Sequence, residues 1–560
     1  MKQIPLAWRK GLYPMPKPLP RTRFYWICLS LVILAVIGYC VYFIIYQTAR
    51  QDAFKTNAED LAIMDQAIWS LLHGSLFHQT VCNVLTDTNC YGLSGISRFA
   101  LHFEPILFPA SLLYVLWADP KTLLVFQTLV VASGAFPAFW LARLRLRSAW
   151  AAVPFALLYL LYPAQLYAQT FDFHAETLTA ALLLFAIYFL YIRKTIWCFV
   201  FIVLSLACKE EIAGVVAMLG LWALLLQRRK RVGLGLLALA FCWTGVGLIV
   251  VHYASPVGHS LLASRYSYLG NNIVQVVVNV LTHPVSMIKA HVLEASHSQY
   301  LRDLLAPAGY LPLLAPWILV LAAPTLALNL FSSNPGMYSG RYQYNAEIVP
   351  ILIFATIEAT VLIVWATRWL LMMMVSERRA VHVQEEEPAV PSPSGWRHGV
   401  SPALLVRVGV LGLVLCFMLA RLYVTTSAYN GYNPIPYSRG FLWPHVTAHN
   451  RLASHFLNEI PATASVTTQT KLGPHLSERQ EIYLFPYAVG HADYILLDAT
   501  GFFYPYADYN AFASEARSIL QGGTYGVVDM GDGYLLLKRG SAPHNVAQAL
   551  QMIAENAHSY

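Results

Sequence analysis

The strongest constraint on this chain is a series of apolar runs long enough to cross a lipid bilayer. A membrane-spanning helix needs about 20 apolar residues, and the runs 24–46 and 403–425, among others, reach that length. Of the 560 residues 57% are hydrophobic and 12% are charged, and the mean hydropathy is +0.51. Soluble domains of this size do not have such a composition. The chain is therefore predicted to be a polytopic α-helical membrane protein, with its first run retained as an anchor because it is too long for a cleavable signal peptide.

The positions of the charged residues predict how the protein lies in the membrane. Residues 1–23 carry Lys and Arg but no acid, which places the N-terminus in the cytoplasm under the positive-inside rule. The Arg and Lys clusters around residues 143–147, 193–194, 228–231 and 378–379 then fall on the inner side, and the Asp, Glu and His clusters fall outside. The net charge of +8 is thereby explained by inner loops. We expect no nucleic-acid partner, and we expect a protein of the plasma membrane whose partners include membrane lipids.

The same analysis divides the chain into regions. We predict a cytoplasmic N-terminus (1–23), a membrane domain (24–375) with a large first external loop (47–103), a polar cytoplasmic linker (376–402), a last span (403–425) and an external domain (426–560). About nine to eleven transmembrane helices are expected in total. The segments 106–118 and 309–331 are short or broken by prolines, so whether they cross is left open, with a non-crossing hairpin favoured for the second.

The last region, 426–560, is predicted to be a small α/β domain. Short alternating apolar runs predict strands, and two amphipathic runs predict helices. The step Met530-Gly531-Asp532-Gly533 is typical of a hairpin turn between the last two strands. The predicted strands are 464–468, 481–485, 493–497, 525–528 and 534–538, and the predicted helices are 445–458 and 508–521.

The best candidate for a catalytic centre is the stretch that opens the first external loop. Asp60 and Asp65 follow directly after the first span, and acids so close to a bilayer are costly to desolvate and tend to be functional. Five residues apart on a helix, they would point about 140° away from each other, so one of them should be structural. A plainer interpretation stays open, in which Asp60 only caps an interfacial helix.

Further polar clusters follow at the outer ends of the predicted spans. They share one side of the membrane, which favours a functional interpretation. Plainer interpretations stay open for each: Lys209 could form an internal ion pair with a neighbouring Glu, His102 could hydrogen-bond Glu104, and Tyr344 could belong to an aromatic belt at the membrane surface. The candidates are His102, Glu104, Asp172, His174, Glu176, Lys209, Glu210, Arg265, Arg341 and Tyr344.

Two of the eight cysteines stand apart from the others. Cys82 and Cys90 bracket a polar part of the first external loop, where a disulfide could persist. We predict that they are bonded to each other. The other six lie within or beside apolar segments, where a small polarizable side chain simply packs, and no His/Cys spacing predicts a zinc site.

Several of these motifs resemble the bacterial membrane-protein family catalogued as domain of unknown function 2079. The likeness covers roughly residues 55–370 and extends into the C-terminal domain. It lies in the run Asp60 to Trp69, in His102-Phe-Glu-Pro105, Phe171-Asp-Phe-His174, Lys209-Glu-Glu211 and Tyr342-Gln-Tyr344. The family name implies no activity, but its architecture is similar to that of the GT-C superfamily of glycosyltransferases, which use sugars linked to polyprenyl phosphate.

The resemblance implies a function and roles for residues. GT-C enzymes place an essential acid in the first external loop and a second acidic motif in a later one, which implies Asp60 for the first position and Asp172 for the second. The chain would transfer a sugar from a polyprenyl-phosphate donor to an acceptor, left open here, on the outer face. The second motif is Asp172-Phe173-His174 rather than Asp-x-Asp, which puts dependence on a divalent cation (Mg or Mn) in doubt. Such an inference from fold alone is an analogy.

The residue types suit this chemistry. A base, Asp60 or else Asp65, would take the proton of the acceptor hydroxyl. Arg341 is the first choice for binding the phosphate, because its planar fork binds phosphate in a bidentate way, with Lys209 and Arg265 behind it. Asp172, His174 and Glu176 could orient the acceptor or hold a divalent ion.

Two other classes of function remain as alternatives. A lipid or glycolipid flippase predicts ionisable residues in mid-membrane, paired broken helices and internal repeats, whereas here the ionisable groups lie at the outer ends of the runs. A non-catalytic scaffold would use the C-terminal domain to recruit a partner and would leave the acids near the membrane unexplained.

Overall fold

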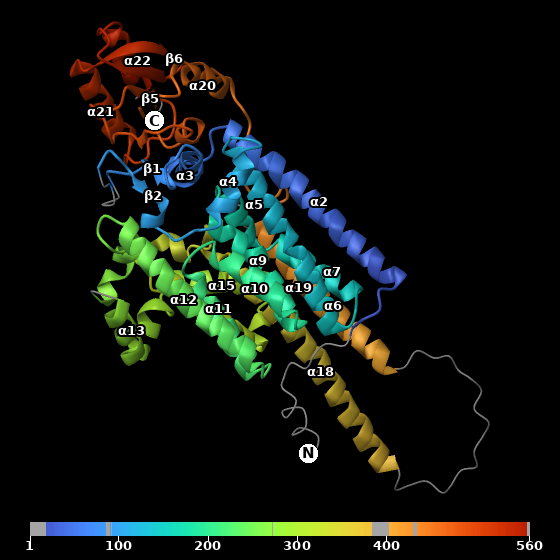
Figure 1. The fold of residues 1–560 in the computed structure, drawn as a ribbon. Helices are drawn as coiled ribbons and strands as arrows, with labels where there is room; N and C mark the ends of the chain where they lie inside the picture. Colours follow the sequence, from blue (N-terminus) through green and yellow to red (C-terminus); the bar gives the residue numbers. More distant parts are fainter. Residues whose placement is uncertain are drawn as a thin grey trace.

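The structure is a computed structural model that describes residues 18–85, 90, 92–270, 273–382, 402–428 and 434–556. An elongated bundle of helices carries a small domain at one end, built from the last part of the chain (Figure 1). The cationic residues before Pro18 and most of the predicted linker 376–402 lie outside the described residues.

Long apolar helices form the bundle, as the sequence predicts. In the described part of the chain, five of them are long and apolar enough to cross a membrane. They are α2 (Arg23–Asp52), the run Lys121–Leu146 made of α5 (Lys121–Ser133) and α6 (Ala135–Leu146), α12 (Lys230–Ala254), α18 (Val349–His382) and α19 (Pro402–Ala428).

Shorter apolar helices complete the bundle. One pair, α7 (Val153–Leu160) with its preceding turn and α8 (Pro163–Thr170), bends by 45° at Tyr162, where a proline begins the second helix. Other short apolar helices include α9 (Thr179–Tyr191), α10 (Thr195–Leu206) and α11 (Ile212–Leu225). Small residues allow α11 and α12 to pack closely, since a Cβ added at Gly233 would lie 2.8 Å from the carbonyl oxygen of Gly220.

The two segments that were left open are broken into short pieces. Helix α4 (Leu107–Tyr114) has eight residues and rises only about 12 Å, less than half of a bilayer core, so it does not cross alone. Residues 311–330 form η7 (Leu311–Leu314), α16 (Pro316–Leu319), η8 (Val320–Ala322) and α17 (Ala323–Leu330), with prolines in the first turns of η7, α16 and α17.

The region after α12 is more helical than expected. The sequence suggested one or two interfacial helices there, whereas the structure has η5 (Leu261–Leu269), α13 (Ile273–Thr282), α14 (Pro284–His291) and α15 (Ala295–Leu305). Helix α13 is strongly amphipathic, with Val276 and Val280 among its apolar residues. Short 3₁₀ turns follow at η6 (Ala306–Ala308), η9 (Pro335–Tyr338) and η10 (Gln343–Asn345).

The C-terminal domain contains one mixed sheet of five strands. Its strand order is β4 (Ile482–Leu484), β3 (Val466–Thr468), β5 (Tyr494–Asp498), β7 (Tyr534–Arg539) and β6 (Tyr525–Gly531). The first three strands are parallel, and β7 pairs antiparallel with both of its neighbours. The predicted hairpin is present, because Asp532 and Gly533 both have positive φ, as tight hairpin turns require.

Three helices accompany this sheet, of which the sequence predicted two. They are α20 (Ala448–Glu459), α21 (Tyr509–Gln521) and α22 (Val546–Asn556). Apolar side chains of α21 and α22 pack on one face of the sheet, and Phe456 of α20 packs on the other. Thr447 begins α20 with a capping box to Asn450, which fixes where the chain from α19 enters the domain.

The domain covers the first loop of the chain. Figure 1 shows it above α3 (Ile63–Leu72), β1 (His78–Gln79) and β2 (Ile96–Ser97), at the end of the bundle where α2 and α19 finish. Helix α6 finishes, and α12 and α19 begin, toward the opposite end. The cationic clusters at Arg145 and Lys230 and the carboxylate-rich first loop therefore lie at different ends of the molecule, in agreement with the charge sorting in the sequence.

A candidate active site at the first loop

Asp60 lies on an unusual turn at the start of the first loop. Residues Ala58–Ala62 form a π-helical turn, η1, that leads into α3. Such turns are rare and are frequent at functional sites. The N-cap of this turn is Asn57, so Asp60 is not a helix cap. Its carboxylate keeps 21% of its surface exposed and faces a pocket.

His174 contacts the Asp60 carboxylate directly. Its Nε2 lies 3.3 Å from Oδ1 of Asp60. Gln127 of α5 holds the backbone around this histidine, because its amide donates to the carbonyl of Asp172 at 3.0 Å and accepts from the backbone N–H of His174 at 3.0 Å. The backbone that carries His174 is therefore held by a buried glutamine, while Nε2 of its ring faces the acid.

Asp172 is fully buried and does not line the pocket. Arg50, at the end of α2, lies 3.2 Å from its Oδ1. The backbone N–H and the side-chain amide of Asn57 donate to Oδ2 at 2.9 and 3.1 Å. Burial raises the pKa of Asp172, and the Arg50 charge opposes that rise. The second acid implied by the resemblance therefore connects Arg50 of α2 with Asn57, the cap of η1.

The pocket above these residues gathers most of the side chains that the sequence singled out. It contains about 1100 Å³ of space, counted to its open mouth. Predicted residues in its lining are Asp60, His102, Glu104, His174, Glu176, Lys209, Arg265 and Tyr344. Glu59, Thr80, Cys82, Asn83, Arg98, Leu262, Gln343 and Tyr487 are among the others. The separate loops that the sequence predicts to be external therefore converge on one site.

Two cations in this lining are already paired with acids. Arg98 donates in a bidentate way to Glu104, at 2.8 and 3.2 Å. The Nζ of Lys209 lies 2.9 Å from both Glu176 and Glu211, above the ring of Tyr344. Burial alone would lower the pKa of Lys209, but the nearby carboxylates raise it well above its usual range. Both side chains therefore stay charged.

Arg265 is the lining cation without a carboxylate partner among the described residues. Its Nη1 contacts the sulfur of Met337 at 3.8 Å, which is a weak acceptor, and no acid of the described chain lies within ion-pairing distance. An anionic ligand can bind this guanidinium without breaking an existing ion pair.

His102, which lines the pocket, forms a second pair with Glu210. Nδ1 of His102 lies 2.9 Å from Glu210, which also accepts from the backbone N–H of Phe103 at 2.9 Å. Burial, followed by the charge of Lys209, lowers the pKa of His102 to about 3, so the imidazole is neutral and donates to the carboxylate. The suggested bond between His102 and Glu104 is absent from the described structure, because each of them has a different partner.

Three carboxylates surround the ammonium group of Lys209. Oxygens of Glu176, Glu211 and Glu347 lie within 4.8 Å of one another, as the ligands of a divalent cation would. Glu347 is fully buried and accepts from Thr325 at 2.6 Å. Because Lys209 already contacts two of the three, these acids enclose an internal cation and do not form a donor set that is open to a metal ion.

Asp65, the other predicted candidate for the base, is placed away from the pocket. It is fully buried, and its two oxygens accept from the hydroxyls of Tyr114 and Ser477. Burial, reinforced by Glu478, raises its pKa to about 8, so it is protonated at neutral pH. The helical argument that only one of the two acids faces a site is consistent with this placement.

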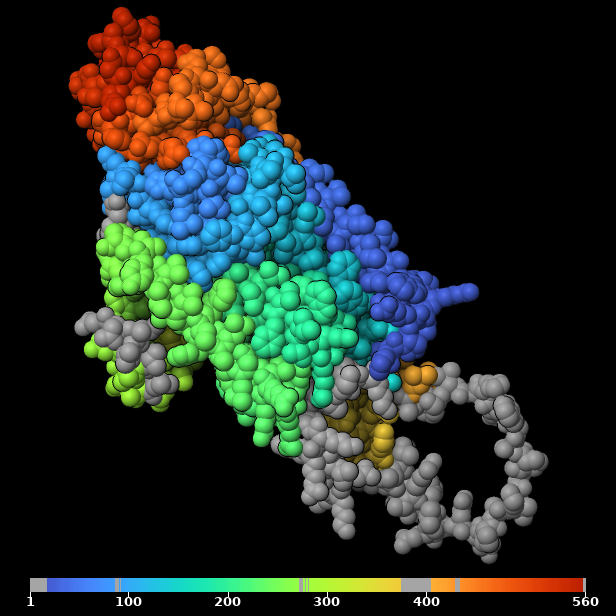
Figure 2. Space-filling view, in the orientation of Figure 1, coloured from blue at the N-terminus to red at the C-terminus, as the bar shows by residue number. Residues whose placement is uncertain are grey.

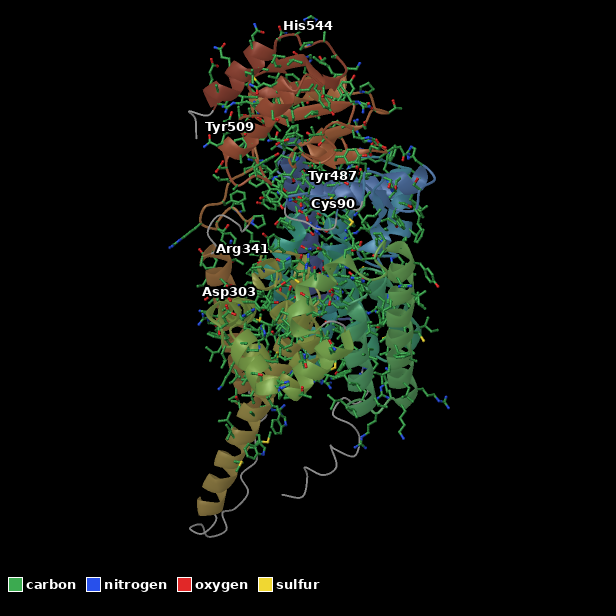
Figure 3. The ribbon with its side chains drawn as sticks, turned by 90° about the vertical axis from the view of Figure 1, so that its left-hand side faces the viewer. Cys90, Asp303, Arg341, Tyr487, Tyr509 and His544 are labelled. Carbon is green, nitrogen blue, oxygen red and sulfur yellow. A yellow bond between two sulfur atoms is a disulfide. The ribbon has the colours of Figure 1, made fainter. Side chains whose placement is uncertain are left out.

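Arg341, the first choice for binding the phosphate, also lies elsewhere. It is exposed and does not line the pocket in the described structure. Figure 3 shows it on the flank of the membrane part near Asp303, apart from Tyr487, which lines the pocket. Tyr342, beside it in sequence, stacks edge-on against Phe171, so the segment turns its aromatic residue inward and its arginine outward.

The C-terminal domain closes one side of the site. Tyr487 lines the pocket, and Tyr504 receives a hydrogen bond of 2.9 Å from Asn83. Tyr483 donates to the carbonyl of Leu93 at 2.8 Å. The disulfide between Cys82 and Cys90 lies in this same loop, with Cα atoms 5.6 Å apart. The space-filling view shows the domain resting directly on the first loop (Figure 2).

Sequence reasoning missed several of these residues. Arg50 and Arg98 could have been found, because they are cations on the predicted outer side, where the positive-inside rule makes cations infrequent. Gln127 and Tyr487 gave no such signal. An amide inside an apolar run and a tyrosine in a small soluble domain have no visible purpose until the fold brings them to Asp172 and to the pocket.

Comparison with known proteins gives a family and a similarity of fold. Residues 50–536 match the family described as predicted membrane protein (DUF2079), and no curated protein matches the sequence. The structure is similar to that of ArnT from Cupriavidus metallidurans bound to undecaprenyl phosphate, with a TM-score of 0.47 and 12% identity over 92% of this chain and 98% of that chain. The apo state of that protein gives a TM-score of 0.48 and 12% identity over 91% and 97%.

Proposed function

We propose that this chain, which belongs to the DUF2079 family of predicted membrane proteins, is a membrane glycosyltransferase of GT-C type. The family name states no reaction, so the proposal is argued from the pocket. It transfers a sugar from a polyprenyl-phosphate-linked donor to an acceptor hydroxyl on the outer face of the membrane. The observation that carries this proposal is the joint placement of the Asp60–His174 pair and the unpaired Arg265 in one pocket lining.

The arrangement suits a substrate that is half in lipid and half in water. The pocket is lined by the first loop, by Lys209 between α10 and α11 and by Tyr344 at the start of the span that continues as α18. A polyprenyl tail lying in the bilayer would bring its phosphate to this level. Tyr487 and the disulfide-bonded loop line the pocket on the side of the C-terminal domain, where an acceptor would enter from water.

Asp60 acts as the general base in this mechanism. The acceptor hydroxyl attacks the anomeric carbon of the sugar, the bond between that carbon and the phosphate oxygen breaks, and the hydroxyl proton passes to the Asp60 carboxylate. The products are the glycosylated acceptor and polyprenyl phosphate, and Asp60 later loses its proton to water. His174 holds the carboxylate oriented through Nε2, and Asp172 holds η1 in place through Asn57.

Arg265 and Lys209 stabilise the leaving phosphate. Negative charge grows on the phosphate as the bond to the sugar breaks, so preoriented cations lower the barrier. Arg265 is free of carboxylates in the described structure and can bind in a bidentate way. Lys209 is held by two acids and can present its remaining N–H. We therefore assign the phosphate to Arg265 first, in place of Arg341.

We derive no step through a divalent cation. The carboxylates that could bind one, Glu176, Glu211 and Glu347, surround Lys209, which supplies positive charge beside the pocket. A metal ion would have to displace this ammonium group from two contacts of 2.9 Å.

The test uses purified protein in nanodiscs and a panel of polyprenyl-phosphate sugars, with release of polyprenyl phosphate as the measurement. We expect Asp60→Asn to lower turnover about 10²- to 10⁴-fold, the usual contribution of a general base. Asp65→Asn is the matched control, since it changes a neighbouring acid outside the pocket, and it should retain turnover. Arg265→Gln and Arg341→Gln form a second matched pair, of which only the first should impair the reaction.

The same experiment can contradict the proposal. One such result is that folded wild-type protein turns over none of the donors, while wild type and Asp60→Asn bind the donor lipids with equal affinity. The flippase and scaffold alternatives then become the better explanations. Equal loss of turnover in Asp60→Asn and Asp65→Asn would instead show that Asp60 matters for structure and not for proton transfer.

A further inference from the structure

A second pocket lies at the end of the bundle opposite to the C-terminal domain. It is formed where α6 ends and where α18 and α19 run side by side, and it contains about 950 Å³ of space, counted to its mouth. Its lining combines arginines with apolar side chains. The residues are Arg145, Leu146, Arg147, Val361, Val364, Trp365, Arg368, Trp369, Met372, Arg407 and Leu411.

One of its four arginines is already neutralised. Arg145 binds both oxygens of Glu358 and donates to the hydroxyl of Tyr191 at 3.2 Å. Glu358 is buried, so this is an internal ion pair that joins α6 to α18. Arg145 therefore forms a wall of the pocket and is not available to a ligand without the loss of that pair.

The other three arginines bring positive charge without a matching acid. Arg147, Arg368 and Arg407 have no carboxylate within ion-pairing distance among the described residues. Arg407 donates to the carbonyl of Leu146 at the end of α6, which holds its guanidinium at the pocket. Three like charges that converge from three helices repel one another, and an anion between them removes that cost.

The remaining wall of the pocket is apolar and aromatic. Val361, Val364 and Leu411 lie on it, and Trp365 and Trp369 stack with their rings 6.4 Å apart and 12° from parallel. Both tryptophans are more than half exposed, as expected for side chains at the level of lipid head groups. A free inorganic anion would gain nothing from this surface, whereas a lipid with an acyl chain would cover it.

We propose that this pocket binds an anionic glycerophospholipid, with its phosphate between Arg147, Arg368 and Arg407 and an acyl chain along Val361, Val364 and the two tryptophans. Basic pockets between transmembrane helices on the inner side are suited to such head groups. This site is independent of the proposed sugar transfer, because it lies at the other end of the molecule and shares no lining residue with the first pocket.

Native mass spectrometry of the full-length protein in detergent tests the proposal. It is titrated with phosphatidylglycerol and, separately, with phosphatidylcholine of the same acyl chains. We expect tighter binding of phosphatidylglycerol to the wild type, and about a 10- to 30-fold loss in Arg147→Gln/Arg368→Gln, from roughly 1 kcal/mol per basic residue. The matched control is Arg193→Gln/Arg231→Gln, which changes two exposed arginines outside the pocket.

Several results would overturn the proposal. They are equal affinity for the two lipids, an unchanged affinity for phosphatidylglycerol in the pocket variant, or an equal loss in the control variant. Competition by millimolar inorganic phosphate as effective as competition by lipid would make this a site for a free anion. Melting temperatures of both variants without added lipid, measured alongside, must match the wild type, so that a folding defect is not read as lost binding.

Discussion

Replacing Lys209 by methionine should destabilise the protein, because it removes a buried cation from a cluster of carboxylates. Lys209 is 3% exposed, and its Nζ lies 2.9 Å from oxygens of both Glu176 and Glu211. Oxygens of Glu347 belong to the same cluster. Methionine retains most of the length of the side chain and removes the charge, so the change reports on electrostatics more than on packing.

The size of the effect follows from those two distances. At 2.9 Å and an effective dielectric constant of 20, each ion pair contributes about 6 kcal/mol of attraction. The cost of taking these charges out of water offsets most of that sum, and breaking one buried pair costs about 3–5 kcal/mol in other proteins. A loss of about 4 kcal/mol corresponds to roughly 3 °C in melting temperature for a chain of 560 residues.

Thermal unfolding of the purified protein in detergent at pH 7 measures this effect. The control is Lys194→Met, an exposed lysine whose loss should change stability by less than about 0.5 kcal/mol. In Lys209→Met/Glu176→Gln one uncompensated acid is gone, so part of the stability should return. The reasoning is refuted if Lys209→Met melts with the wild type, or if the double variant is no more stable than the single one.

Four further predictions follow from the structure. Asp65→Asn should remove a pH dependence of the free energy of unfolding. Because the pKa of Asp65 is raised to about 8, the wild type should lose up to about 4 kcal/mol of stability as pH rises from 5 to 8. Unfolding of the two proteins measured across that range should therefore diverge. Cys82→Ser/Cys90→Ser should cost about 2.5 kcal/mol by loop entropy, and non-reducing mass spectrometry should find the two cysteines, eight residues apart, bonded. His449 contacts Asp498 and Asp532, and its hydrogen bond to Asp498 raises its pKa to about 9. His449→Gln should therefore destabilise the C-terminal domain at pH 7. Above pH 9 to 10, where the wild-type imidazole is neutral, thermal unfolding of the two proteins should match. Sugar transfer, once a donor is identified, should persist in EDTA, since Lys209 supplies the charge that a metal would; loss of turnover with recovery on adding Mg²⁺ or Mn²⁺ would contradict this.

The sequence predicted the features that depend on neighbouring residues. Apolar runs of bilayer length fixed the long helices, and the sorting of charge placed the carboxylate-rich loops at one end of the bundle. Alternating residues and an Asp-Gly turn located the hairpin of β6 and β7. These features are local or depend only on the membrane, so the residues themselves carry the information.

The roles of individual site residues depend on distant contacts, and the sequence could not rank them. Asp60 and Asp65 are alike in sequence, but Asp65 is buried between Tyr114 and Ser477, the second of which is 412 residues away. Arg265 and Arg341 both lie in segments predicted to be external, and only the fold shows which of them lines the pocket. The π-helical turn that presents Asp60 has no sequence signature in this stretch.

The C-terminal domain explains why the first loop has a defined shape at all. Buried polar groups of the loop find their partners in residues 470–482: Gln66 donates to the carbonyl of Arg479 at 3.2 Å, and Thr80 accepts from the backbone N–H of Ile482 at 3.0 Å. The backbone N–H of Ala58, beside Asp60, donates to the carbonyl of Thr470 at 2.8 Å.

Without those partners each buried group would cost about 1–3 kcal/mol, and η1 would lose its hydrogen bond to the C-terminal domain. Lys471 adds a further bond, from its ammonium to Oδ1 of Asn57 at 2.7 Å. The residue that caps η1 is therefore hydrogen-bonded both to a buried acid from the membrane part and to a lysine from the C-terminal domain. Since Asp60 lies only three residues further on, the domain is part of the structure that positions the proposed base.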